Sequence, residues 1–216
     1  MNKAKSTDLS YSKLKDLGML FKVRLTITVV LSAILAYMIA LDGSVSFISI
    51  VVLSLGGFAV TASANTFNQI LEKDYDCHMK RTEDRPLAAG RISVSYAILL
   101  AGFLALLGVG TLAYFNVWAA FFGCLSLVSY AFVYTPLKRI SSIAIPVGAI
   151  PGAMPVLIGC VAAQGELTFL ALVLFSIQFF WQFPISGRSA GWDLMIIKKL
   201  DSNLSLLMGR VKGILT

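Results

Sequence analysis

Charged residues are scarce in this chain of 216 residues. Asp, Glu, Lys and Arg together make up 13% of it, whereas hydrophobic residues make up 57%. The mean hydropathy is +0.82. A water-soluble core does not need so much apolar sequence, so the composition excludes an ordinary soluble domain and indicates an integral membrane protein.

Cysteine and histidine are also rare, with three and one respectively. Cys77, Cys124 and Cys160 form no CxxC pair, which argues against a disulfide framework and against a zinc site of common spacing. The formal net charge is +7. The basic residues cluster at the ends of apolar runs, which is typical of membrane topology, so we expect membrane lipid and no nucleic acid as a partner.

The apolar runs predict an all-α, polytopic bundle of about six transmembrane helices, because each run is close to the length that a bilayer requires. The expected spans are about 25–42, 46–67, 93–114, 117–134, 142–163 and 167–184. Residues 1–24 lack the pattern of a cleavable signal and are interpreted as a cytoplasmic leader. Lys and Arg fill the leader, the 72–92 loop and the 135–141 turn, which predicts a cytoplasmic N-terminus in the cytoplasmic (inner) membrane.

The fifth expected span is interrupted by Pro146, Pro151 and Pro155, with glycines between them. Such interruptions are tolerated where neighbouring helices or a cavity satisfy the freed backbone groups. Two interpretations stay open for this span: a kinked packing helix with small residues at its contacts, or a helix that lines a cavity.

The segment "NQILEKDYDCHMKRTEDRP" (68–86) gathers charge between two apolar runs. Asn68, Glu72 and Asp76 are spaced by four residues, so on a continuing helix they share one face, about 6 Å apart along the axis. Oxygen-bearing side chains in a row at a membrane boundary need a cation to neutralise them. Mg²⁺, which joins carboxylates to substrate phosphates, suits this set, whereas Asp74 faces elsewhere.

Basic residues follow the carboxylates directly. Lys80, Arg81 and Arg85 are placed to contact a diphosphate through charge-assisted hydrogen bonds. A metal held by acids, beside an anion held by bases, is the arrangement that a diphosphate leaving group requires. The alternative is a solvated charged loop, which the NxxxExxxD spacing disfavours.

Several motifs together resemble one family. "NTFNQILEKDYDCHMKRTEDRPLAAGRIS" (65–93) is similar to the first signature of the UbiA-type intramembrane prenyltransferases. "YTPLKRIS" (134–141), "GAIPGAMPVLIG" (148–159) and "FFWQFP" (179–184) are similar to the protoheme IX farnesyltransferase (heme O synthase) branch of that family. The resemblance covers about residues 20–184.

The resemblance implies transfer of a farnesyl group from farnesyl diphosphate to a vinyl group of heme b, giving heme O. It also implies Mg²⁺, nine transmembrane helices, two acidic motifs and a heme A synthase acting downstream. Asn68, Glu72 and Asp76 match the metal positions, Arg81 and Arg85 match their basic partners, and Lys138 matches a further diphosphate contact. His78 has no counterpart in the motif and is interpreted as a surface residue. The aromatic side chains of "FFWQFP" either line a cavity or pack and face lipid.

From residue 185 the chain departs from the family pattern. A one-base shift in possible codons for "ISGRSAGWDLMIIKKLDSN" restores stretches similar to the family's "HFWAIGW" and "DDYKKAGF". We therefore expect 25–184 to be part of a prenyltransferase domain, lacking three of the nine helices, and 185–216 to be an out-of-frame tail. On this interpretation Asp193 and Asp201 are not the second acidic motif, and the 216-residue chain is inactive.

Three other functions stay open at this point. Another aromatic prenyltransferase, acting on a quinone precursor, shares the same chemistry. A small transporter would use the broken fifth span as a binding site, although no inverted repeat is evident. A non-catalytic remnant would have no function of its own.

Overall fold

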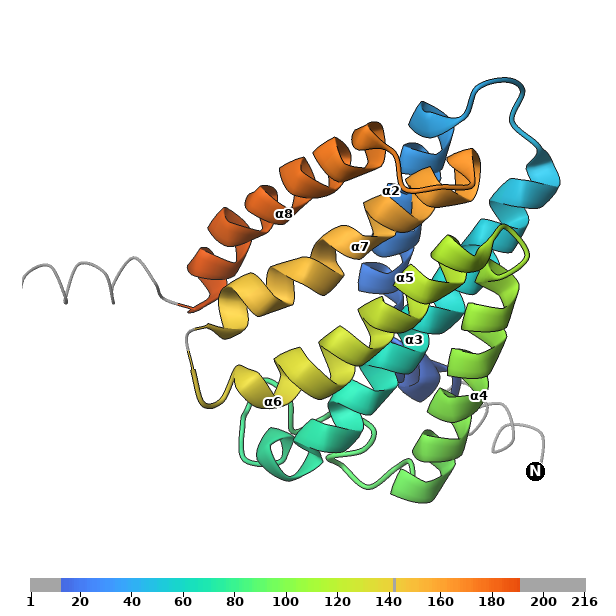
Figure 1. Cartoon of the computed structure of the whole chain (residues 1–216). Helices are drawn as coiled ribbons and strands as arrows, with labels where there is room; N and C mark the ends of the chain where they lie inside the picture. The colour runs from blue at the N-terminus through green and yellow to red at the C-terminus, as the bar shows by residue number, and fades with distance from the viewer. Residues whose placement is uncertain (1–12, 142, 191–216) are drawn as a thin grey trace, which may run out of the picture.

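The computed structural model describes residues 13–141 and 143–190, with side chains described as far as residue 183. These residues form helices and connecting turns, and no strand occurs among them. Residues 13–20 are helical, and the elements that follow are shown in Figure 1. They are α2 (Val23–Ala40), α3 (Phe47–Asp76), α4 (Val94–Leu112), α5 (Val117–Val128), η1 (Ser129–Tyr134), α6 (Thr135–Leu137), α7 (Ala144–Gln164) and α8 (Phe169–Ala190).

Five of the six expected spans are confirmed as helices long and apolar enough to cross a membrane. They are α2, α3, α4, the continuous run Val117–Leu137 and α7. The sixth expected span corresponds to α8, whose fully described apolar part covers Phe169–Phe183. The all-α membrane bundle predicted from the apolar runs is therefore the observed fold. The expected tail lies outside the described residues, apart from the backbone of 185–190, which continues α8.

The proline-containing helix α7 occupies the centre of the bundle. Within its most apolar window 61% of residues are buried, against 17–39% in the other four spans. Gly159 of α7 meets the backbone of α2 at Ala33 and Tyr37, so closely that a Cβ could not be accommodated. A void partly lined by Pro155 and Ile158 holds only about 20 Å³. These contacts favour a packing helix with small residues over a cavity-lining one.

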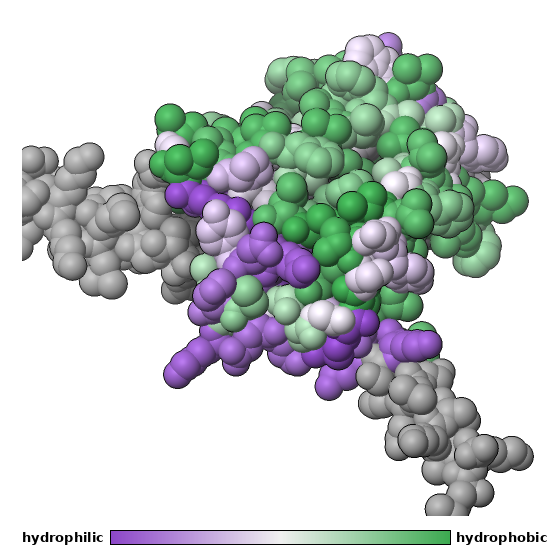
Figure 2. All heavy atoms as spheres, turned by 90° about the horizontal axis from the view of Figure 1, so that it is seen from below, coloured by the Kyte–Doolittle hydropathy of each residue, from purple (hydrophilic) through white to green (hydrophobic). Residues whose placement is uncertain are grey.

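One end of the bundle is polar. The start of α2, the loop 77–93 and α6 lie together at the lower end in Figure 1. Seen from that end, hydrophilic residues gather in one region while hydrophobic side chains cover most of the remaining described surface (Figure 2). A membrane protein needs this distribution where its helices leave the hydrocarbon layer.

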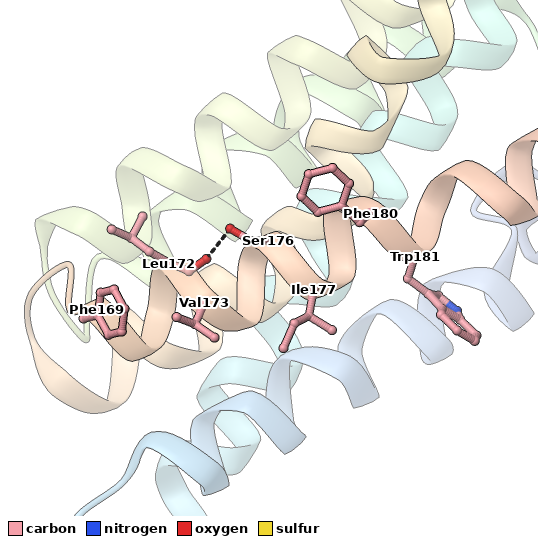
Figure 3. Close-up of a pocket in the computed structure, with 7 residues that line it drawn as sticks. All are labelled: Phe169, Leu172, Val173, Ser176, Ile177, Phe180 and Trp181. Atoms are coloured by element: carbon pink, nitrogen blue, oxygen red, sulfur yellow. Dashed lines mark hydrogen bonds between the residues drawn. The ribbon is translucent and has the colours of Figure 1, made fainter.

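Helix α8 presents apolar side chains outward. A shallow hollow of about 610 Å³ lies on its surface and is lined by residues of this one helix, which Figure 3 draws as sticks. Phe180 and Trp181 of the "FFWQFP" motif are 68% and 65% exposed, so they line no interior cavity among the described residues. Gln182 points the other way and donates to the Gly152 carbonyl of α7 at 3.3 Å.

Candidate active site

Helix α3 continues beyond its apolar part and carries the predicted acidic residues. Asn68, Glu72 and Asp76 share one face, as their spacing predicts, and are only 1%, 7% and 4% exposed. The Asn68 amide donates to Glu72 Oε2 at 3.1 Å. Two carboxylates are therefore held at the end of the bundle and shielded from bulk water, which makes compensating cations necessary.

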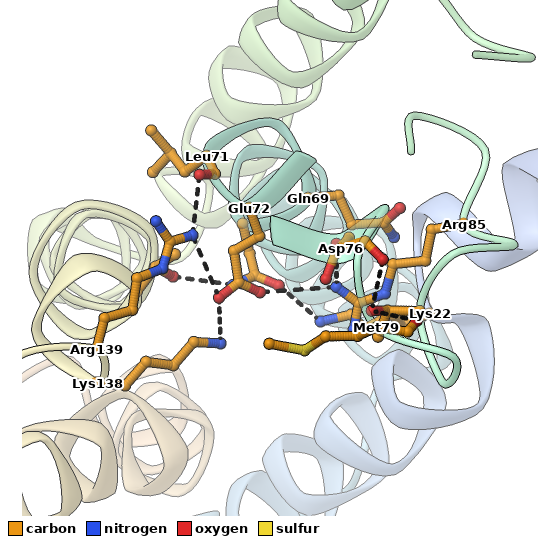
Figure 4. A network of polar contacts seen from close by, with 12 residues as sticks. Lys22, Gln69, Leu71, Glu72, Asp76, Met79, Arg85, Lys138 and Arg139 are labelled. Atoms are coloured by element: carbon orange, nitrogen blue, oxygen red, sulfur yellow. Dashed lines mark hydrogen bonds and ion pairs between the residues drawn. The ribbon is translucent and has the colours of Figure 1, made fainter. Parts of the chain in front are cut away.

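Three cations provide this compensation (Figure 4). Arg85 Nη1 lies 2.5 Å from Asp76 Oδ2 and 3.6 Å from Glu72 Oε2. From the opposite side, Lys138 Nζ lies 2.6 Å from Glu72 Oε1, and Arg139 Nη2 lies 3.7 Å from the same oxygen. Glu72 is thus contacted from two different segments of the chain.

The loop after α3 turns back so that Arg85 faces the carboxylates. The Thr82 hydroxyl donates to the Asp76 carbonyl at 3.1 Å and so satisfies a main-chain oxygen at the helix end. Farther along, Arg91 Nε donates to both oxygens of Asp16 at 2.9 and 3.1 Å, while its Nη1 donates to Asp84 at 2.9 Å. These bonds fasten the loop to the helical segment 13–20.

A π-helical turn brings the second basic segment to the site. In η1 the backbone is widened, and the Thr135 hydroxyl donates to the Tyr130 carbonyl, five residues back, at 2.9 Å. The same hydroxyl accepts from the Asn68 amide at 3.0 Å. Such turns often occur at functional sites. Here the contact aligns the start of α6 with α3, and Lys138 follows directly after it.

Arg139 is a member of the site that the sequence did not reveal. Its Nη2 donates to the Leu71 carbonyl at 3.0 Å, and its guanidinium lies 3.8 Å from the centre of the Tyr75 ring. Both contacts orient the guanidinium over the end of α3. Its position next to Lys138 is the one signal that could have suggested it.

Lys22, at the start of α2, is the other unpredicted member. Its Nζ donates to Asn68 Oδ1 at 2.9 Å. Burial, with Arg85 and Lys138 close by, lowers the pKa of Lys22 to about 8, so the amine remains largely protonated at pH 7. In the sequence Lys22 indicated topology only, because nothing local connects it with a residue 46 positions away.

Other predicted residues lie outside this network. Lys80 and Arg81 are exposed and form no ion pair within the described part of the chain, so their contact with a diphosphate stays a prediction. Asp74 and His78 are exposed too, as expected for residues outside the site. His78 Nδ1 lies 2.8 Å from the Asp74 carbonyl.

The donor set can be tested against the expected metal. Among the described residues no three His, Cys, Asp or Glu side chains cluster in a way that could hold a metal ion. The predicted set offers two carboxylates and one amide oxygen, all hard donors. Mg²⁺ is commonly bound through one or two carboxylates together with substrate phosphates. The set therefore fits a Mg²⁺ shared with a diphosphate, rather than one held by protein ligands alone.

The fold and this site define a multi-pass helical membrane protein with a cluster of charged side chains at one end of the bundle. Residues 29–195 match the model of the UbiA prenyltransferase family. Because the match covers more than half of the chain, the chain belongs to the UbiA prenyltransferase family.

Curated relatives agree with this assignment. A protoheme IX farnesyltransferase of Flavobacterium johnsoniae is 40% identical over 196 residues, covering 90% of this chain and 65% of the relative. One of Cytophaga hutchinsonii is 46% identical over 166 residues, covering 76% and 58% respectively. The mitochondrial protoheme IX farnesyltransferase of Arabidopsis thaliana is 40% identical over 76% of this chain and 39% of its own. The chain thus spans less than two thirds of the length of these relatives.

Solved structures share the fold. A structure described as digeranylgeranylglyceryl phosphate synthase superposes with a TM-score of 0.72 at 23% identity, over 87% of this chain and 66% of that one. A UbiA homolog from Archaeoglobus fulgidus, bound to DMAPP and Mg²⁺, gives 0.64 at 16% identity, over 79% and 62%. At these identities the likeness concerns the fold alone.

Proposed function

We propose that this protein carries the diphosphate-binding half of a heme O synthase, which transfers a farnesyl group from farnesyl diphosphate to a vinyl group of heme b. The observation that carries the proposal is the convergence of Arg85, Lys138 and Arg139 on two buried carboxylates, with Lys22 bonded to Asn68 beside them. Cations outnumber carboxylates there by four to two, which suits an anion. The names of the curated relatives support farnesyl diphosphate and heme b as the substrates.

In this proposal the ion pairs exchange partners when substrate binds. The diphosphate oxygens take over the hydrogen-bond donors of Arg85, Lys138 and Lys22, which converge on Asn68, Glu72 and Asp76 from three segments. The carboxylates, released from these cations, would then hold Mg²⁺ with Asn68. When bound, Mg²⁺ would supply a positive charge that stabilises the departing diphosphate.

The chemistry needs little from the protein beyond this charge distribution. The bond between the allylic carbon and its oxygen breaks, and its electron pair leaves with the diphosphate. The vinyl group of heme b supplies the pair for the new carbon–carbon bond, and water adds to the vinyl carbon left electron-deficient and loses a proton, which gives a hydroxyl group. In this proposal Arg85 and Lys138 would lie beside the leaving group as its negative charge grows, which is the arrangement that lowers a barrier electrostatically.

The same proposal places the site at the cytoplasmic face of the cell (inner) membrane. Lys and Arg gather at the end where Glu72 and Asp76 lie, and the positive-inside rule puts that end in the cytoplasm. The substrates would be farnesyl diphosphate and heme b, with membrane lipid around the bundle. A heme A synthase is the expected consumer of the product.

Binding of inorganic pyrophosphate with Mg²⁺ to the purified chain tests the site directly. Glu72→Gln and Asp76→Asn should each weaken Mg²⁺-dependent binding at least tenfold, because even the outer-shell partners of metal ligands typically contribute about 10–100-fold to metal affinity. Asp74→Asn is the matched control, since Asp74 is exposed on the same helix. Equal affinity in all three variants would show that these carboxylates hold no metal.

We also propose that residues 185–216 are read in a shifted frame. The motifs quoted from the sequence end at Pro184, and the match to the family model ends shortly after them, at residue 195. Genomic sequence through codons 180–220 decides the question. If the proposal holds, restoring one base near codon 185 recovers heme O formation in cells lacking another synthase, and the 216-residue chain alone forms none.

A further inference from the structure

The turn between the helical segment 13–20 and α2 has an unusual backbone. Lys22 has φ 49° and ψ 53°, in the left-handed region, and is the only non-glycine with positive φ among the described residues. Residues with a Cβ adopt this region rarely and stay there only when surrounding contacts hold them. The residue concerned is the one whose amine reaches Asn68.

Two buried amides of α3 provide those contacts. Gln69 Nε2 donates to the carbonyls of Met19 and Leu20 at 2.9 and 3.0 Å. Asn65 Nδ2 donates to the Phe21 carbonyl at 3.1 Å. Carbonyls at the end of a helix have no partner within that helix, so side-chain donors are needed there. Three successive carbonyls before Lys22 thus each accept from one of two side chains that are 1% exposed. The Phe21 carbonyl also accepts from the Thr26 hydroxyl at 2.7 Å, and the Met19 carbonyl from the Lys22 backbone N–H at 3.3 Å.

These amides belong to the same face of α3 as the site itself. Asn65, Asn68, Gln69 and Glu72 follow one another at intervals of three, one and three residues, which places them on one side of the helix. One rigid helix therefore holds both the backbone of the turn and the Asn68 oxygen that Lys22 contacts. In Figure 4 Gln69 and Glu72 extend from the same helix beside Lys22.

The unpaired oxygen of Gln69 supports a specific use of its nitrogen. Gln69 Oε1 is buried and has no hydrogen-bond partner within the described part of the chain. A buried acceptor without a partner is destabilising, so an apolar residue would pack more favourably here if packing were all that mattered. The two bonds from Nε2 to the turn offset this penalty.

We propose that Gln69 and Asn65 are positioning residues for the diphosphate site. They hold the backbone of residues 19–21 so that Lys22 is presented to the diphosphate beside Asn68. This inference rests on the proposed function, in which Lys22 is one of the cations that bind the diphosphate. Neither amide contacts the substrate.

A double-mutant cycle on the full chain in detergent tests the proposal, with Mg²⁺ and inorganic pyrophosphate titrated by calorimetry. Lys22→Met should weaken binding about tenfold, the usual loss for one charge-assisted hydrogen bond. Gln69→Leu should weaken it similarly. The double variant should bind no more weakly than Lys22→Met, because Gln69 acts through Lys22.

Asn116→Leu is the matched control, because Asn116 also donates an amide to a backbone carbonyl, that of Val161, at 2.7 Å. It should lower the melting temperature and leave pyrophosphate affinity unchanged. If Gln69→Leu does not fold, Asn65→Ala takes its place in the cycle.

The outcomes separate the two proposals. If the unaltered chain binds pyrophosphate and the losses of affinity in the cycle are additive, the positioning role is overturned and the proposed function still stands. Unchanged affinity in Lys22→Met would do the same. No pyrophosphate binding by the unaltered chain would overturn the proposed function, and the positioning role with it.

Discussion

Arg85 is the main partner of the two buried carboxylates, and replacing it with methionine tests how much the site depends on it. Its Nη1 lies 2.5 Å from Asp76 Oδ2 and 3.6 Å from Glu72 Oε2. The side chains of Asp76 and Glu72 are only 6% and 9% exposed, so water cannot fully replace a lost guanidinium. Methionine keeps the aliphatic stem and removes only the charge and the donors.

The expected loss follows from the burial of the partners. Removing one member of a buried ion pair generally costs about 3–5 kcal/mol. Arg85 is itself 23% exposed, and Lys138 still contacts Glu72. We therefore expect Arg85→Met to lower the free energy of unfolding by about 2–3 kcal/mol, between the values for surface and buried pairs. For a chain of this size, the melting temperature should fall by roughly 4–12 °C.

Thermal unfolding in detergent, followed by circular dichroism, measures this loss. Arg81→Met is the control, because Arg81 is exposed and should change stability by no more than about 0.5 kcal/mol. Adding Asp76→Asn to Arg85→Met removes the uncompensated charge and should regain part of the loss. Equal losses for Arg81→Met and Arg85→Met, or a double variant less stable than Arg85→Met, would refute the reasoning.

Two further predictions concern topology and packing. In a background without the native cysteines, Tyr114→Cys should react with a membrane-impermeant thiol reagent in intact cells, whereas Glu83→Cys should not. Both positions are exposed, so accessibility within the fold does not distinguish them. The reverse labelling would invert the proposed orientation. Gly159→Ala should destabilise the chain by about 1–3 kcal/mol, because its methyl group would meet the backbone of α2. Gly102→Ala, in open space on α4, should cause no loss, and equal melting temperatures for the two variants would contradict this packing.

The bundle and the acidic half of the site could be predicted because their signals are local. Apolar runs of membrane length predict spans, and the four-residue spacing of Asn68, Glu72 and Asp76 predicts one helix face. The structure confirms both, since α3 ends at Asp76 and buries all three side chains. Arg85 was predicted by the same reasoning, and the chain returns it to Asp76, nine positions earlier in the sequence.

Local reasoning could not separate Arg85 from Lys80 and Arg81. All three lie in the same loop and carry the same charge. Their positions depend on main-chain bonds such as Thr82 to Asp76, and on the attachment of Arg91 to Asp16, 75 residues away. Contacts outside the loop therefore decide which of its basic side chains points toward the carboxylates. The spacing of residues within the loop does not reveal these contacts.

The net charge of the site is a further property that the spacing of residues in the sequence does not predict. Counted along the sequence, the segment from Asn68 to Arg91 contains five acidic and five basic residues, which describes a neutral loop. In the folded chain the network around Glu72 and Asp76 also includes Lys22, Lys138 and Arg139 from two other segments, and it excludes Lys80 and Arg81. The excess of positive charge that suits a diphosphate is therefore a property of the tertiary structure. It arises where Lys22, the loop 77–93 and the residues after α6 meet on one face of α3.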